Sequence, residues 1–232
     1  MNKTKSIPQL EYKKSNKKEI IWCIICLVAY IVIKHTPILR LLFPTNNSVT
    51  ISLFISLIPD LVILCMAFFI FKDILKRDLK VFKENSKQYI KYLCPRFIIF
   101  IVIYIIVSAI CTMLLANGQK SENQEILELL PIWFLIADGA IIGPILEEFI
   151  FRGIFRRFLS NKIVFILFSA IIFGIVHVVF EENLKTAIIQ MVPYSVMGGF
   201  FAYIYASTDN LTTNMLCHIT YNALCVFFGI IS

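Results

Sequence analysis

Long apolar runs restrict what this chain can fold into. Several stretches, such as residues 97–115, reach the ~18 residues that an α-helix needs to cross a bilayer. In lipid, the backbone polar groups of such a stretch must be bonded within the segment itself, which favours helices. The sequence therefore predicts an all-α, polytopic transmembrane helical bundle with its functional site inside the bundle. About seven spans are expected, at 20–36, 49–71, 92–115, 131–155, 163–180, 186–206 and 211–231.

Lysines and arginines divide unevenly between the two sides that these spans create. Sixteen fall in 1–19, 72–91, 156–162 and 207–210, and four fall in the segments on the other side. Cytoplasmic loops carry the excess of basic residues, so the N-terminus is predicted to be cytoplasmic and the C-terminus external. The net charge of +7 is therefore explained by topology, with membrane lipid rather than nucleic acid as the partner. Segment 72–91 also suits anionic headgroups.

The first span is short, because its apolar core covers only residues 20–33. A basic start followed by a short apolar core is also typical of a secretory signal peptide. However, residues 34–37 offer no small-residue cleavage site, and a helix continued toward Leu42 would be longer. We therefore expect a membrane span here.

Charged side chains interrupt the fourth span. Glu147, Glu148 and Arg152 lie within an otherwise apolar segment, where charges are costly and point to function or pairing. Glu148 and Arg152 are four residues apart, so they share a helix face and can neutralise each other. Glu147 is rotated about 100° away, and its own face carries the apolar Phe151 one turn on. This makes Glu147 the candidate general base.

A polar stripe marks the last span, where Asn214, His218 and Asn222 recur every four residues. A single polar residue in a span often joins two helices, whereas three on one face predict the lining of a wet cavity. His177, in the fifth span, adds a second imidazole from another helix.

Two chemistries fit these side chains. In one, Glu147, His177 and His218 bind zinc and leave a fourth position for water. In the other, Glu147 and His177 take a proton from water without a metal. His218 and Asn222 then donate hydrogen bonds to the developing oxyanion. Both chemistries predict hydrolysis of an amide bond within the membrane.

Three motifs, in this order on successive spans, resemble those of the CPBP family. These are the CAAX prenyl protease and bacteriocin-processing intramembrane proteases, also called the Abi family. The motifs are E-E-x-x-x-R at 147–152, F-x-x-x-H at 173–177 and H-x-x-x-N at 218–222. The resemblance covers residues 131–232, so these four spans are expected to form a catalytic core. Residues 1–130 then form a variable N-terminal region of three spans within the same membrane domain.

The resemblance implies an intramembrane endopeptidase with a division of labour among its site residues. The first glutamate is implied as the catalytic carboxylate, supported by the second glutamate and the arginine. The histidine of the second motif is implied in water activation, and the histidine and asparagine of the third motif at the oxyanion. The implied site residues are Glu147, Glu148, Arg152, His177, His218 and Asn222.

The resemblance leaves the cofactor open, because the family has been described both as metalloproteases and as metal-free glutamate proteases. We favour the metal-free reading, since Asn222 lies one turn from His218, where a second hydrogen-bond donor is useful. Zinc held by Glu147, His177 and His218 is the alternative.

The depth of the site residues does not agree between helices. At ~1.5 Å per residue from the basic edge, Glu147 and His218 lie roughly 12–13 Å deep and His177 about 22 Å. We therefore expect the fifth helix to be tilted or irregular, helped by Gly174. A kink at Pro144 is also expected.

The composition favours a bacterial cell membrane, because it is rich in Lys and Ile and poor in Gly, Ala and Arg, as in AT-rich genomes. A membrane-associated peptide or protein, such as a peptide precursor or bacteriocin, is then a better substrate than a prenylated protein. The alternative function is a non-catalytic immunity or scaffold protein that binds a toxin or its receptor. A proton-coupled transporter is disfavoured, because the two halves show no inverted repeat of broken helices.

Overall fold

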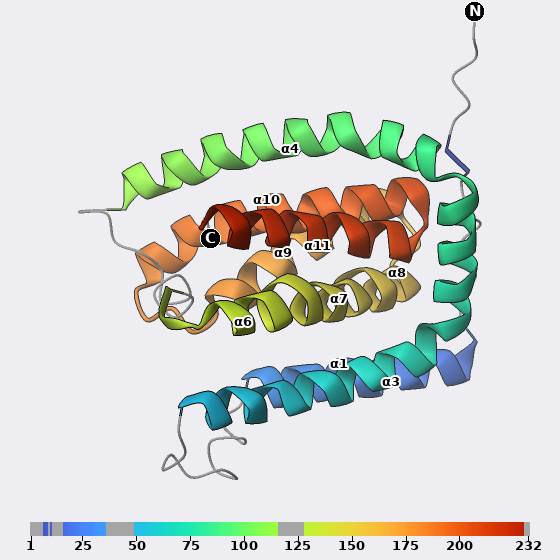
Figure 1. Cartoon of the computed structure of the whole chain (residues 1–232), viewed down its shortest axis with the longest axis horizontal. Coiled ribbons are helices and arrows are strands. Elements are labelled where there is room, and N and C mark those ends of the chain that lie inside the picture. Colours follow the sequence, from blue (N-terminus) through green and yellow to red (C-terminus); the bar gives the residue numbers. More distant parts are fainter. Residues whose placement is uncertain (1–6, 9, 11–15, 36–48, 116–127, 230–232) are drawn as a thin grey trace, which may run out of the picture.

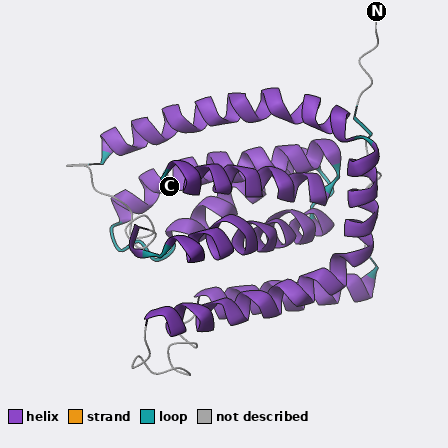
Figure 2. Ribbon diagram, viewed as in Figure 1, coloured by secondary structure: helices purple, strands orange, loops and turns teal. Residues whose placement is uncertain are grey.

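The computed structural model describes residues 7–8, 10, 16–35, 49–115 and 128–229, and this part of the chain contains helices and no strand (Figures 1 and 2). Between α4 and α9, five segments follow one another and form the central rod, residues 132–158. These segments are α6 (Ile132–Phe134), η2 (Leu135–Ile142), α7 (Gly143–Glu147), η3 (Glu148–Ile154) and α8 (Phe155–Phe158). The other helices are α1 (Lys17–His35), α3 (Val49–Glu84), α4 (Ser86–Leu114), α9 (Lys162–Val178), α10 (Leu184–Thr208) and α11 (Leu211–Phe228).

The seven rods so formed coincide with the seven expected spans, which confirms the predicted all-α, polytopic membrane bundle. Three of the helices, at 50–84, 86–114 and 184–208, are long and apolar enough to cross a membrane by themselves. The helix α9 is apolar but shorter. The extension of the first helix toward Leu42 and the polar segment 116–127 lie outside the described residues.

Segment 72–91 was expected to be a loop, but the structure shows a helix there, broken only near Asn85. Its residues are mostly good helix formers such as Lys, Leu and Glu. This half of α3 turns away from the first half and crosses the ends of the other rods (Figure 1). Its buried Asp78 accepts a hydrogen bond of 2.6 Å from the backbone N–H of Leu211, and its carbonyl accepts one of 3.0 Å from the Asn210 amide. We call these contacts the α3 clasp.

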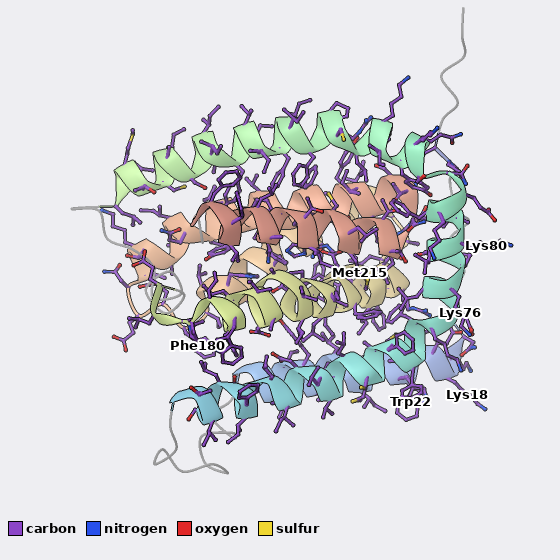
Figure 3. All side chains as sticks on the ribbon, viewed as in Figure 1. Lys18, Trp22, Lys76, Lys80, Phe180 and Met215 are labelled. Atoms are coloured by element: carbon purple, nitrogen blue, oxygen red, sulfur yellow. The ribbon has the colours of Figure 1, made fainter. Side chains whose placement is uncertain are left out.

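Basic side chains from separate segments gather at this end of the molecule. Lys18, Lys76 and Lys80 lie together there, while Phe180 lies at the opposite end (Figure 3). The structure thus places Lys18, near the start of α1, on the same side as Lys76 and Lys80 of α3.

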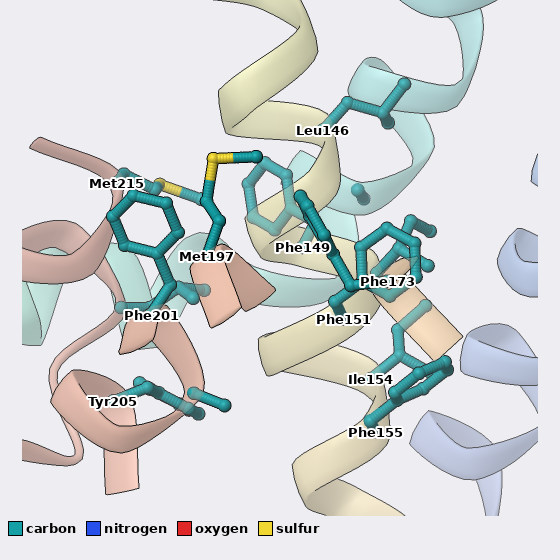
Figure 4. Packing of buried hydrophobic residues seen from close by; sticks show 14 of the residues in the cluster. Leu146, Phe149, Phe151, Ile154, Phe155, Phe173, Met197, Phe201, Tyr205 and Met215 are labelled. Atoms are coloured by element: carbon teal, nitrogen blue, oxygen red, sulfur yellow. The ribbon is translucent and has the colours of Figure 1, made fainter. Parts of the chain in front are cut away.

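The core surrounds the central rod, which is buried on every face from residue 148 to 155. Aromatic side chains fill it, with Phe149, Phe151, Phe173 and Phe201 almost completely buried (Figure 4). The helix α1 joins this core through Tyr30, whose ring packs edge-on against Phe151.

The helices α9 and α10 pack closely because each carries a glycine at the contact. A Cβ on Gly198 would lie 2.6 Å from the Cβ of Phe173, and one on Gly174 would lie 2.1 Å from the Ser195 hydroxyl. The close approach sets the position of the helix that carries His177.

Replacing Gly198 tests this contact. We expect Gly198→Ala to destabilise the protein by about 1–3 kcal/mol, the usual cost of overpacking a core, because the backbones must separate. The neighbouring Gly199→Ala is the control, since its Cβ would lie 3.4 Å from the Cβ of Ala170. The thermal unfolding midpoints of both variants are measured in detergent. Equal midpoints for the two variants would contradict the packing argument.

Candidate active site

The structure brings five of the six expected site residues into one cluster. Glu147 ends α7, while Glu148 and Arg152 belong to the π-helical segment η3. His177 comes from α9 and His218 from α11. The wide turns of π-helices are often found at functional sites, and here one begins between the two glutamates.

Glu148 is the centre of a buried polar network. Its Oε1 lies 3.0 Å from a terminal nitrogen of Arg152 and 2.8 Å from Nδ1 of His218. Its Oε2 accepts a hydrogen bond from the Asn214 amide. All four side chains are completely or almost completely buried. A buried carboxylate requires such partners, because ionised groups lose their hydration in the core.

Arg152 is neutralised from several sides. Besides forming the expected ion pair with Glu148, it donates a hydrogen bond of 2.9 Å to the carbonyl of Gly198. Its guanidinium carbon also lies 5.0 Å from the ring centre of Phe173 and 5.5 Å from that of Phe201. Aromatic faces attract cations at these distances, so the charge is held between α9 and α10.

Both histidines direct Nε2 toward Glu147. Nδ1 of His177 lies 2.7 Å from the carbonyl of Phe173, and Nδ1 of His218 lies 2.8 Å from Glu148. Since both partners accept hydrogen bonds, Nδ1 is assigned as the protonated nitrogen in each ring. The Nε2 atoms of His177 and His218 each lie 3.8 Å from one oxygen of Glu147.

Aromatic rings fix the orientation of both imidazoles. His177 lies between Phe173 and Tyr194, with ring centres 4.3 and 4.6 Å away. His218 stacks on Phe201 at 4.1 Å. The helix α10, which carries Tyr194 and Phe201, therefore backs the site although none of the three motifs lies on it.

Exposure separates the two glutamates. The side chains of Glu147 and His177 are 21% and 19% exposed, whereas those of Glu148 and His218 are 0% and 1% exposed. Glu147 and His177 can therefore meet water and substrate, while Glu148 acts only within the core.

Asn222 lies one turn beyond His218 and has a different local partner. Its amide donates a hydrogen bond of 2.7 Å to the carbonyl of Gly139, in the π-helical segment η2. The second amide hydrogen of this side chain is left for another acceptor. Asn222 thus joins α11 to the central rod close to the histidine.

The expected mismatch in depth is not seen, because His177 lies beside Glu147. The helix α9 is regular through His177, so irregularity of this helix is not the reason. The irregular geometry instead belongs to the central rod, where π-helical segments lie on both sides of α7 and Pro144 is near their junction. Gly174 permits the close approach of α9 to α10.

Sequence reasoning included Asn214 in the polar stripe but gave it no place in the site. In the structure it binds Glu148 directly, so the stripe was the available signal. The carbonyl of Gly198 and the rings of Tyr194 and Phe201 were missed. Backbone acceptors and stacked rings have no sequence motif of their own.

Whether this site suits zinc depends on where its donor atoms lie as well as on their chemistry. One carboxylate and two imidazoles match the preferences of zinc, whose ligand atoms lie about 2.0–2.2 Å from the metal. Across the described residues, however, no group of three His, Cys, Asp or Glu side chains is arranged to hold a metal ion.

Comparison with known proteins identifies bacterial relatives. The chain is 34% identical over 116 residues to the "Putative membrane peptidase YdiL" of Bacillus subtilis, covering 47% of this chain and 43% of the relative. It is 26% identical over 171 residues to the "Membrane-embedded CAAX protease MroQ" of Staphylococcus aureus, covering 69% and 66%. The matches thus span less than two thirds of the length of each of these relatives. No solved structure matches the chain significantly.

A family model described as "Type II CAAX prenyl endopeptidase Rce1-like" matches residues 128–224. This range contains all six expected site residues and the four rods that carry or back them. The resemblance that the three motifs predicted is confirmed, since residues 128–224 match the model of this family of type II CAAX prenyl endopeptidases.

Proposed function

We propose that this chain is an intramembrane endopeptidase that hydrolyses a peptide bond in a membrane-associated peptide or protein. Glu147 is the general base, and no metal takes part. One observation carries the proposal: the Glu147 carboxylate lies between two oriented imidazoles, 3.8 Å from Nε2 of each. Glu147 and His177 are on the partly exposed side of an otherwise closed core, and His218 lies just inside it.

Water activation follows from the distance between Glu147 and His177. A separation of 3.8 Å is too long for a direct hydrogen bond and leaves both groups able to share one water. The water donates one hydrogen to Glu147 and the other to Nε2 of His177. Its oxygen lone pair then faces the substrate carbonyl. Glu147 takes the proton as the oxygen attacks the carbonyl carbon.

His218 and Asn222 stabilise the oxyanion that forms in the proposed reaction. Asn222 donates its second amide hydrogen, since the first binds Gly139. His218 donates from Nε2 when its ring is doubly protonated, a state in which Glu148 supplies the counter-charge. Collapse of the intermediate re-forms the carbonyl and breaks the C–N bond. The leaving amine takes the proton from Glu147, which restores the carboxylate.

The setting of the reaction is also proposed. The lysine-rich end faces the cytoplasm of a bacterial cell, and residues 131–232 form the catalytic core that residues 1–130 surround in part. The relatives carry the names peptidase and CAAX protease. The proposed substrate is a peptide or protein segment at the membrane, with peptide maturation or bacteriocin immunity as its cellular context.

Substituting each of the two glutamates in turn separates an effect on catalysis from an effect on stability. We expect Glu147→Gln to lower cleavage by at least about 100-fold, the contribution of a general base, while leaving the thermal midpoint near that of the wild type. Glu148→Gln removes the carboxylate that pairs with buried Arg152 and should cost about 3–5 kcal/mol. The measurements are thermal midpoints in detergent and peptide termini in membranes and medium of cells at matched expression.

The exposed Glu182 provides a matched control as Glu182→Gln. New peptide termini that appear with wild type and with this control, but not with Glu147→Gln, support the peptidase. Identical peptide profiles for all variants, together with an intact protective phenotype, would instead favour the immunity or scaffold function.

Chelation tests the metal-free assignment. We expect the purified protein to keep full activity after treatment with EDTA and 1,10-phenanthroline, and to contain less than about 0.1 zinc per chain by elemental analysis. Loss of activity that added zinc restores would contradict metal-free water activation by Glu147 and His177. The protein would then be a zinc peptidase using the same side chains.

A further inference from the structure

A groove between α4 and α10 lies on the face of α10 that is turned away from the active site. Its volume is about 380 Å³. Ile99 and Ile103 of α4 and Val196 of α10 line its length, and Arg96 and Tyr203 lie at one end. The helix α4 contacts the rest of the bundle mainly through α10, so the groove follows its main attachment.

The contacts that the fold gives Arg96 come from neutral groups. Its Nε donates to the Tyr203 hydroxyl at 3.3 Å, one terminal nitrogen donates to the Tyr92 carbonyl at 2.9 Å, and the guanidinium lies 3.6 Å from the Tyr92 ring centre. Among the described residues, no carboxylate lies within ion-pair distance of Arg96. A charged side chain in an apolar span is a candidate binding group, and the described part of the chain gives Arg96 only neutral partners.

The direction of the groove matches the orientation of a lipid. Arg96 is five residues beyond the exposed Lys91, or about 7.5 Å along α4, which is close to the lysine-rich surface. From there the lining becomes apolar toward Ile103 and Val196, deeper in the bundle. The groove therefore has a cationic end at headgroup level and an apolar path toward the bilayer centre.

We propose that this groove binds an anionic phospholipid of the leaflet on the lysine-rich side. Arg96 binds the phosphate, because a guanidinium pairs with phosphate oxygens in a two-pronged geometry. The Tyr203 hydroxyl adds a hydrogen bond, and one acyl chain lies between Ile103 and Val196. This site is independent of the proposed peptidase chemistry and shares no residue with it.

Lipid binding to the purified full-length chain tests the site. The delipidated protein is titrated in neutral detergent with phosphatidylglycerol or phosphatidylcholine, and bound lipid is counted by native mass spectrometry. We expect the wild type to bind phosphatidylglycerol about tenfold more tightly, and Arg96→Gln to remove most of this preference. Ile103→Trp, which fills the apolar path, should weaken binding of both lipids.

Lys91→Gln is the matched control, because it removes an exposed positive charge from the same helix outside the groove lining. The Lys91→Gln variant should keep the preference for phosphatidylglycerol over phosphatidylcholine. If Arg96→Gln kept the preference, or Lys91→Gln lost as much of it, diffuse attraction would explain the binding and the proposal would fail. If Arg96→Gln does not fold, Ile103→Trp decides alone, and unchanged lipid binding in that variant overturns the proposal.

Discussion

The buried ion pair of Glu148 and Arg152 is the contact on which the arrangement of the site helices depends. A carboxylate and a guanidinium inside a membrane protein are tolerated only when each is fully compensated. Glu148 obtains partners from α11, and Arg152 obtains a carbonyl and ring faces from α9 and α10. Satisfying this one pair therefore fixes three helices around the central rod.

The same arrangement of helices sets the surroundings of the neighbouring Glu147. Glu147 and Glu148 are adjacent in sequence but point to different surroundings, one partly exposed and one enclosed. His218 connects them, because its two ring nitrogens face the two carboxylates. The structural network thus holds the ring of His218 in place directly, while the contact with the Phe173 carbonyl holds the ring of His177. Rigid positioning of this kind is what a water-activating site requires.

Sequence reasoning recovered the parts of the site that are set by spacing. The pairing of Glu148 with Arg152 follows from their separation by four residues, and the stripe on α11 supplies Asn214 and His218 as partners of Glu148. The predicted depth of His177 was wrong, because counting residues assumes straight helices that stand upright in the bilayer. Sequence reasoning also missed the helix at 72–84, since a charged segment between spans is compatible with loop or helix. Partners that are backbone carbonyls, such as that of Gly139, cannot be read from side-chain patterns.

The α3 clasp has a consequence for how the protein is made. Asp78 is synthesised 133 residues before Leu211, the backbone group that it binds. The first helices therefore enter the membrane before the chain that completes their contacts exists. Until α11 arrives, this carboxylate stays hydrated at the surface or relies on Arg77 beside it. Closure of the bundle at the lysine-rich end therefore waits for α11, and a chain that ends before residue 210 cannot form the clasp.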